Sequence, residues 1–344
     1  MSTVSRRSFL WTSGAVVGGG MVPNFLRRRA DAAGPELVPR KLPFPPNDDF
    51  GSYEPTITAD GNTIYFARFA GSGDKRVLGT TTDIFVTHRV RQGAEWPGTG
   101  ADWSTPERLP DTVNSDAPDQ EPWISGDGRT LYFMSRRASG RGSADIWVTE
   151  KQSDGQWTPA RNLGPNINTE FPDHCFMPFD LSGYQDTRQF VSIRPRAAGA
   201  TPSADLYTTR LVNGVWQPAQ RYESKLLDSI GLKCRFNVVT WDGLVLGVVS
   251  VHDFGKFHTM LFVHYDPASR EWKGPIVEAP FNQSNVDGAC PTFTASGDKM
   301  IWSAGYDRGP GPVSTAGGTG STYDLYWLKT SEIVAYYKAK AGLA

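Results

Sequence analysis

Beyond its first 35 residues, the chain alternates short apolar runs with compact turns, and this arrangement repeats. Runs such as 63–66 and 130–133 combine β-branched and aromatic residues, and each follows an Asp-Gly turn. Apolar runs of this length, bounded by turn residues, are typical of β-strands. A turn glycine recurs at positions 61, 128, 183, 243 and 297. The pattern therefore predicts five successive units, each built from β-strands.

Two further segments recur at corresponding places in the units. A third apolar segment begins at positions 83, 145, 205, 260 and 324, and a segment led by tryptophan begins at 103, 157, 216 and 272. Four strands in each of five units predict an all-β fold, a five-bladed β-propeller of four-stranded blades that spans residues 34–330.

The fifth unit lacks a fourth strand of its own, because the chain turns helical after Lys329. The segment Pro39–Pro43 matches Pro106–Pro110 in the first unit. Residues 36–43 are therefore predicted to form the outermost strand of the last blade, which closes the ring and removes an exposed sheet edge. Residues 331–344 are predicted as a short C-terminal helix and tail, with Thr330 or Ser331 as its N-cap.

The second unit carries the most regular form of the repeat. Its segments 122–136, 144–148 and 157–164 resemble the WD40-like repeat of TolB-type propellers, and the resemblance is strongest over 116–168. Such a repeat implies the propeller fold. It does not imply one activity, because exported binding propellers and some carbohydrate-active enzymes share related repeats.

The N-terminus has the features of an export signal. Residues 5–10 read Ser-Arg-Arg-Ser-Phe-Leu, an apolar stretch follows, and small residues stand at 30–33. This layout resembles a twin-arginine (Tat) signal, which implies export of the folded protein to the periplasm or the medium. The apolar stretch is shorter than the ~20 residues of a spanning helix, so no transmembrane span is predicted.

Charge and composition narrow the class of partner. The formal net charge is -1, with 35 Lys+Arg against 36 Asp+Glu, so nucleic acid is not an expected partner. Aromatic residues make up 12% of the chain, which is enough to build a folded core. No P-loop or dinucleotide-binding fingerprint is present, so no cofactor is expected. The absence of heptads favours a monomer.

Comparison of the units separates recurring residues from residues found in only one or two blades. Arginines at 68, 136, 194 and 308 recur after the second strand, and aspartates at 83, 145, 205 and 324 recur before the third. We expect these to pair within each blade. The less regular polar residues gather at the starts of inner strands and in loops near the channel mouth. They form the predicted ligand site: Glu54, Glu121, His174, Arg235, His252, His258 and Asp287.

Three interpretations remain open for the cysteines, all of which lie near the starts of inner strands. Cys175, Cys234 and Cys290 are apolar core fillers, or Cys175 and Cys234 form a disulfide, which export permits. Alternatively, His174 and the three cysteines are metal ligands, although no pair has the close spacing of a zinc motif.

Two functions follow from this map. The main prediction is a non-catalytic exported propeller that binds a protein or glycan through its loop-rich channel face, with anchors such as Phe69, Arg137, Arg141, Phe254 and Tyr306. The alternative is an extracytoplasmic carbohydrate-active enzyme with its site at the channel mouth. As a glycoside hydrolase it would use Glu54, Glu121, and Asp287 or His174 as catalytic groups. As a polysaccharide lyase it would use His174 as a base and Arg235 to neutralise a uronate.

Overall fold

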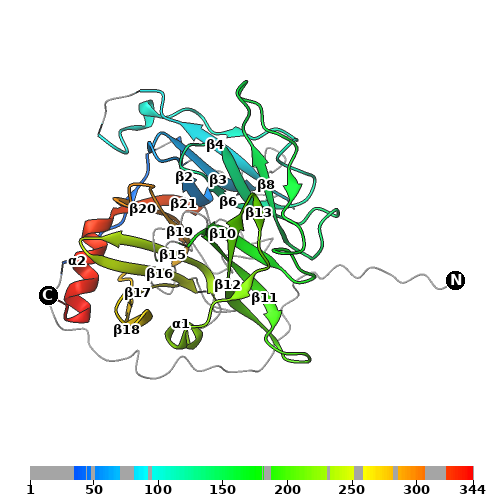
Figure 1. The fold of residues 1–344 in the computed structure, drawn as a ribbon. Helices are drawn as coiled ribbons and strands as arrows, with labels where there is room; N and C mark the ends of the chain where they lie inside the picture. Colours follow the sequence, from blue (N-terminus) through cyan, green and yellow to red (C-terminus); the bar gives the residue numbers. More distant parts are fainter. Residues whose placement is uncertain are drawn as a thin grey trace. The chain divides into compact units, whose positions relative to one another are not determined.

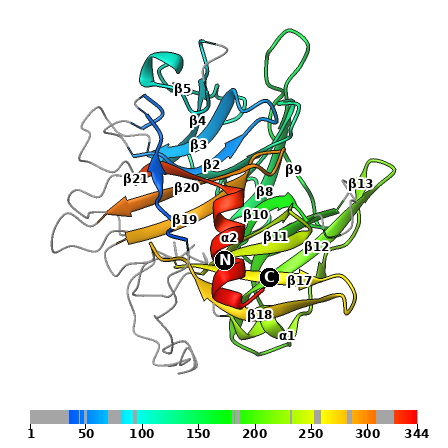
Figure 2. The same ribbon diagram turned by 90° about the vertical axis from the view of Figure 1, so that its left-hand side faces the viewer.

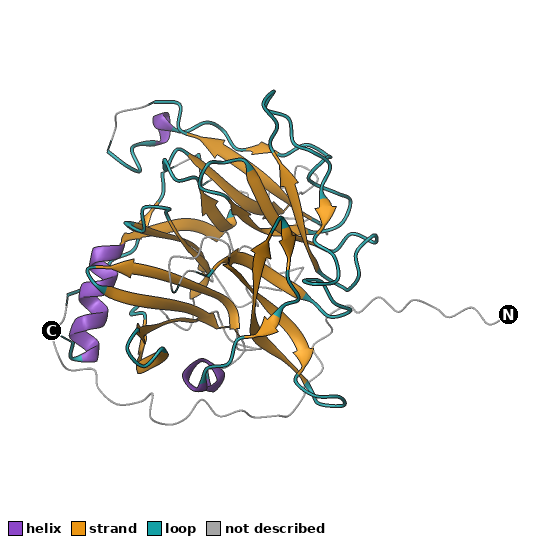
Figure 3. Ribbon diagram, in the orientation of Figure 1, coloured by secondary structure: helices purple, strands orange, loops and turns teal. Residues whose placement is uncertain are grey.

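Antiparallel strands arranged as five sheets form the framework of the described part of the protein, in a computed structural model (Figures 1 and 3). The structure describes residues 35–43, 45–47, 51–69, 81–91, 95–179, 181, 187–230, 233–251, 259–281, 286–306 and 323–343. The sheets are the blades of a β-propeller, which confirms the predicted fold class. In the described ranges, no helix has the length and apolar content needed to cross a lipid bilayer.

The blades follow one another in chain order, and each runs from an inner to an outer strand. The first two are β2 (Tyr53–Ile57), β3 (Thr63–Phe69), β4 (Thr82–His88) and β5 (Glu107–Arg108), then β6 (Asp119–Ile124), β7 (Thr130–Ser135), β8 (Asp145–Glu150) and β9 (Arg161–Asn162). A short 3-10 helix, η2 (Gly100–Asp102), precedes β5.

The third and fourth blades are longer. They contain β10 (Asp173–Pro178), β11 (Thr187–Pro195), β12 (Pro202–Val212) and β14 (Gln220–Arg221), then β15 (Lys233–Trp241), β16 (Leu244–Val251), β17 (Thr259–Asp266) and β18 (Glu271–Glu278). A two-residue strand, β13 (Val215–Trp216), extends β12, and the helix α1 (Lys225–Ser229) links the two blades.

The last blade joins the two ends of the propeller chain. It consists of β19 (Val286–Phe293), β20 (Lys299–Tyr306), β21 (Tyr323–Lys329) and the N-terminal strand β1 (Arg40–Lys41). β1 pairs antiparallel with β21, with Arg40 opposite Trp327. The predicted closure by an N-terminal strand is confirmed.

The C-terminal helix α2 (Thr330–Ala341) covers the last two blades (Figure 2). Its apolar side chains, among them Ile333 and Tyr337, are buried with residues of β16, β17, β20 and β21. The guanidinium of Arg40 donates to both carboxylate oxygens of Glu332, one of them at 2.8 Å, and thereby ties β1 to α2. The N-cap is Lys329, one residue before the predicted position.

Apolar clusters fill the spaces between neighbouring blades. One cluster joins the last and first blades and contains Leu42, Phe66, Trp103, Ile301 and Leu325, all less than 5% exposed. Another joins the first and second blades through residues such as Tyr65 and Leu131. This sheet-on-sheet packing is the main source of stability, because each blade buries both of its faces.

The recurring aspartates have different partners from those predicted. Asp83 forms an ion pair with Arg108 on the outermost strand at 2.6 Å, and Asp324 pairs with Lys41 on β1 at 2.7 Å. Asp145 accepts from Asn162 on β9 at 3.0 Å. The arginine after the second strand points elsewhere: Arg68 lies over the ring of Phe85. The aspartate therefore fastens the third strand to the fourth in these blades.

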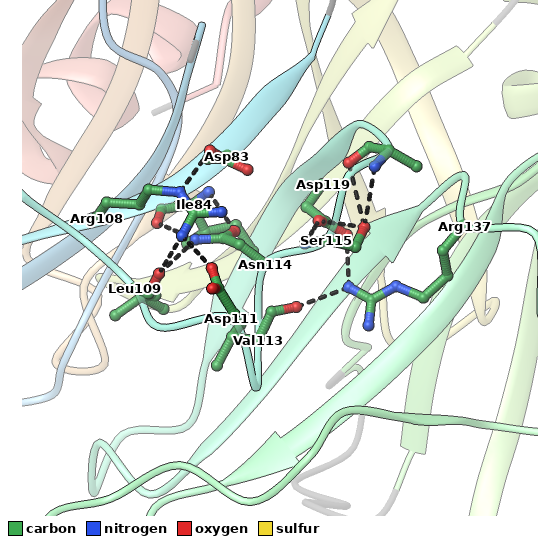
Figure 4. A network of polar contacts seen from close by, with 11 residues as sticks. Asp83, Ile84, Arg108, Leu109, Asp111, Val113, Asn114, Ser115, Asp119 and Arg137 are labelled. Carbon is green, nitrogen blue, oxygen red and sulfur yellow. Dashed lines mark hydrogen bonds and ion pairs between the residues drawn. The ribbon is translucent and has the colours of Figure 1, made fainter.

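A second recurring device, which the sequence comparison missed, is an asparagine after the outermost strand (Figure 4). The side chain of Asn114 accepts from the backbone N–H of Ile84 and donates to its C=O. Asn168 makes the same two bonds to Ile146, each at 2.8 Å, and Asn47 makes them to Leu325. Because the three amides are buried, they satisfy third-strand backbone groups that water does not reach.

Asn168→Ala is expected to lower the free energy of unfolding by about 1–3 kcal/mol, because it leaves the buried N–H and C=O of Ile146 without partners. Urea denaturation measures this loss. Gln156→Ala, an exposed residue of the same blade, is the control and should change stability by less than about 0.5 kcal/mol. Equal effects of the two substitutions would contradict the structural role of the asparagine.

Candidate functional site

The site is built on one irregularity that every inner strand shares. In each blade the pairing between the first and second strands shifts register near the start of the first strand. Four residues at these shifts have positive φ: Glu54 (57°), Glu121 (54°), Cys175 (57°) and Cys290 (55°). In the fourth blade the shift falls at Cys234, between Lys233 and Arg235. Such β-bulges redirect side chains and occur beside functional sites.

The redirected carboxylates connect consecutive blades. Glu54 Oε2 accepts from the backbone N–H of Glu121, and Glu121 Oε2 accepts from the backbone N–H of Cys175, each at 2.8 Å. On the other side, the Cys290 thiol lies 3.9 Å from Glu54 Oε1. The contacts therefore run in sequence through Cys290, Glu54, Glu121 and Cys175. The two glutamates, predicted as ligand-binding residues, are thus linked directly by a hydrogen bond between neighbouring blades.

His174 completes the arrangement around Glu121. Its Nδ1 is 3.0 Å from Glu121 Oε1, so both oxygens of this carboxylate are occupied. The side chains of Glu121 and His174 are 8% and 15% exposed, whereas Glu54 is only partly buried. The hydrogen-bonding capacities of the two glutamates therefore differ. Oε1 of Glu54 has only the Cys290 thiol, a weak donor, beside it among the described residues.

The pKa values of Glu54 and Glu121 are shifted in opposite directions from that of an ordinary glutamate. Burial, together with the neighbouring charge of Glu121, raises the pKa of Glu54 to about 7. Burial also acts to raise the pKa of Glu121, but the charge and hydrogen bond of His174 outweigh it and hold the pKa at about 2. Burial opposes protonation of His174, yet the Glu121 carboxylate raises the pKa of the imidazole. The contact therefore favours an ionised Glu121 and a protonated His174, beside Glu54, whose carboxyl group takes up a proton near pH 7.

Arg235 brings a fourth predicted residue into the same cluster. It lies on β15, is 1% exposed, and donates through Nη1 to the carbonyl oxygen of Cys290 at 3.3 Å. Its positive charge lowers the pKa of both Glu54 and Glu121.

Cys175 and Cys290 are core residues at the bulges. Cys175 and Cys290 are 3% and 2% exposed, and burial raises the pKa of the Cys175 thiol well above its usual value. Cys175 is a free thiol, so the predicted disulfide with Cys234 is absent from this structure. Within the described ranges, no three His, Cys, Asp or Glu side chains converge as metal ligands. The side chain of Cys234 lies outside the described residues.

The remaining predicted residues divide into two groups. His252, His258 and Phe254 lie outside the described residues, as do the side chains of Asp287, Phe69 and Tyr306. Arg137, predicted as a ligand anchor, is instead a structural residue (Figure 4). It donates to the buried Asp119 at 2.7 Å and to the carbonyl oxygen of Val113 at 2.6 Å.

Two residues that sequence comparison missed also contact the cluster. Ser303 Oγ accepts from the backbone N–H of Glu54 at 3.3 Å, and the Tyr53 hydroxyl accepts from Gln120 at 3.2 Å. Nothing in the repeat marks Ser303. The bulge itself had a signal, because Glu54, Glu121 and Cys290 all precede a proline at the same place in their units.

A cavity of about 540 Å³ lies at the opposite end of the inner strands. The turns after β2 and β6 line it, together with His88 and Lys151. Its carboxylates serve their own turns, since Asp60 and Asp127 each accept from a neighbouring hydroxyl. This cavity does not include the carboxylate pair.

No protein-family model matches the sequence, and comparison with curated proteins gives no match. Solved structures do match the fold. An α-L-arabinofuranosidase from Podospora anserina, solved with cellotriose, is 10% identical, with a TM-score of 0.51 over 86% of this chain and 96% of its own. An α-L-arabinofuranosidase from Lactobacillus brevis is 12% identical, with a TM-score of 0.52 over 83% of this chain and 92% of its own. The catalytic domain of a Coprinopsis cinerea GH62 α-L-arabinofuranosidase is 10% identical, with a TM-score of 0.50 over 86% of this chain and 97% of its own.

These comparisons establish the five-bladed propeller fold and correct the functional prediction. The expectation of a non-catalytic, TolB-like binder was wrong, because the three solved structures named above are α-L-arabinofuranosidases, a class of glycoside hydrolase. The physical reason lies in the inner strands. Their bulges bring ionisable side chains from neighbouring blades into contact.

Proposed function

We propose that the protein is a carbohydrate-active enzyme that hydrolyses glycosidic bonds at the channel mouth, with Glu54 as the proton donor and Glu121 as the ionised partner. One observation carries this proposal: two adjacent carboxyl groups have pKa values displaced to about 7 and about 2. Pairs of titratable groups whose surroundings separate their pKa values are typical of acid and base assignments in active sites. The glycosidase fold of the solved neighbours supports the same class.

Each group has a role that its contacts permit. Glu54 is partly exposed, and Oε1 can carry a proton and deliver it to the departing glycosidic oxygen. Glu121 remains a carboxylate and stabilises the positive charge that develops on the sugar ring in the transition state. His174 is a positioning residue, because its hydrogen bond fixes Glu121 and keeps it ionised.

The ion pair disfavours the polysaccharide lyase alternative. A lyase base must accept a proton, so His174 would have to be neutral near neutral pH. Although burial opposes it, the contact with Glu121 raises the pKa of His174, which favours the protonated imidazole over the neutral base that a lyase needs. Hydrolysis uses the protonation states that the cluster favours.

The type of repeat and the location of the enzyme are further proposals. We propose that the blades are TolB-type WD40-like repeats, supported by the matching segments in the second unit. We propose that residues 1–33, which lie outside the described residues, are a Tat signal and that the enzyme is periplasmic or secreted. The twin arginines at 6 and 7 support this proposal.

The test is turnover of a panel of glycosides and polysaccharides by the purified mature chain, followed by a pH profile on the best substrate. Glu54 must be protonated to act as the acid, so kcat/KM is expected to fall as pH rises through about 7. Glu121 stays ionised at all higher pH values, so no second loss is expected between pH 4 and 7. Lack of turnover on the whole panel, or activity that is constant from pH 6 to 8.5, would refute the assignment.

A further inference from the structure

Arg235 has donors that the protein leaves unused. It is 1% exposed, and its Nη1 contacts the carbonyl oxygen of Cys290. Nε and Nη2 are buried and have no hydrogen-bond partner in the part of the chain that the structure describes. Buried donors are almost always paired, because an unmade hydrogen bond forfeits the water that the donor had in the unfolded chain. Two such donors on one buried cation therefore indicate a function.

The geometry of the unused pair is specific. Nε and Nη2 lie on the same edge of the planar guanidinium, with their N–H bonds parallel. This edge forms two parallel hydrogen bonds with a planar carboxylate, the fork arrangement that distinguishes arginine from lysine. A neutral sugar hydroxyl offers one acceptor atom and no charge to such a fork.

The charges of the cluster point to the same kind of ligand. When Glu54 is protonated, the described groups around it are His174 and Arg235, both positive, and Glu121, negative. Among these described groups, one positive charge is thus in excess when Glu54 is protonated. An anion beside Arg235 neutralises this charge and also favours the protonated form of Glu54.

We propose that Arg235 recognises a carboxylate of the substrate, so that the glycan cleaved at this site carries a uronic acid. This inference rests on the proposed function and adds the substrate class to it. The fork binds the C6 carboxylate of the sugar through Nε and Nη2 and orients the ring toward Glu54 and Glu121. It takes no part in bond cleavage, so Arg235 is a specificity-determining residue.

Binding measurements on matched ligands test the proposal without requiring turnover. Titration calorimetry would compare a uronic acid oligosaccharide with the same oligosaccharide after its carboxyl groups are reduced to hydroxymethyl groups. The expected result is at least ~10-fold tighter binding of the carboxylated form. Equal affinity of the two ligands overturns the proposal, and so does tighter binding of a sulfated neutral oligosaccharide than of the uronate.

Two variants of Arg235 distinguish the effect of its paired N–H donors from the effect of its positive charge. Arg235→Met is expected to remove the preference for the uronate, and Arg235→Lys to keep only part of it, because lysine retains the charge without the fork. Arg129→Met is the matched control: Arg129 is exposed at the opposite end of the inner strands, and its loss should leave the preference unchanged. A preference that survives Arg235→Met contradicts the proposal. Should that variant fail to fold, Arg235→Lys and the ligand pair still decide the matter.

The outcomes also distinguish this proposal from the proposed function. Uronate-selective binding without cleavage of any glycan supports the role of Arg235 and refutes the hydrolase assignment. Cleavage of neutral glycans, with no gain in kcat/KM for uronates, supports the hydrolase and refutes the role of Arg235.

Discussion

Glu121→Gln is expected to lower kcat on the best glycan substrate by about 100- to 10,000-fold while the protein stays folded. Glutamine has nearly the same shape as glutamate, and its amide oxygen can still accept from the backbone N–H of Cys175, as Glu121 Oε2 does at 2.8 Å. The substitution removes the negative charge that stabilises the transition state and that holds His174 protonated. Steady-state kinetics and a melting curve measure the two effects.

The control is Glu150→Gln on β8, a glutamate whose side chain is 58% exposed and pairs with Arg161 at the surface. Its kcat should remain within twofold of the parent protein. Glu54→Gln should also abolish the descending limb of the pH profile, because it removes the group that titrates near pH 7. Turnover that survives Glu121→Gln at the parent rate would show that the carboxylate pair is not the catalytic site.

Leu42→Ala is expected to lower the free energy of unfolding by about 2–5 kcal/mol, the usual range for a buried leucine. Leu42 is 2% exposed and follows β1, where it packs in the cluster that joins the last and first blades. Its backbone N–H also donates to Leu325 at 2.8 Å, which holds the closing strand in place. Losing this side chain weakens the packing of the N-terminal segment against the last blade, which the pairing of β1 with β21 otherwise shares.

Val38→Ala is the matched control for this effect, because Val38 lies in the same segment but is 56% exposed. It should change stability by less than about 0.5 kcal/mol. Denaturant unfolding of both variants measures the difference. If Leu42→Ala is no more destabilising than Val38→Ala, ring closure by β1 contributes nothing to stability.

The architecture was predictable because its determinants are local and repeated. The turn glycines at 61, 128 and 297 have positive φ, as the Asp-Gly and Ser-Gly turns require. The match of Pro39–Pro43 to Pro106–Pro110 was sufficient to predict that β1 completes the last blade. In contrast, the aspartate partners were predicted wrongly. Opposite positions on paired strands, such as Arg68 and Asp83, need not have side chains that meet.

The sequence indicated which residues could belong to the candidate site. It did not indicate their protonation states or their contacts. Glu54, Glu121, His174 and Arg235 were selected because they are polar residues near the starts of inner strands that do not recur in every unit. Their roles depend on contacts between different blades, such as the bond from Cys175 N–H to Glu121, residues 54 positions apart in the chain. No local pattern specifies the burial and charge that a side chain meets across a blade boundary.

The sequence alone determined the number of blades, their order and the way the ring closes, because strand periodicity and turn residues act over a few neighbouring positions. Tertiary structure alone decided which carboxyl group holds a proton. Glu54 and Glu121 occupy equivalent positions and both precede proline, yet only Glu121 has His174 beside it. Electrostatic energies depend on distance and desolvation in space, so two residues with the same local sequence acquire opposite acidities.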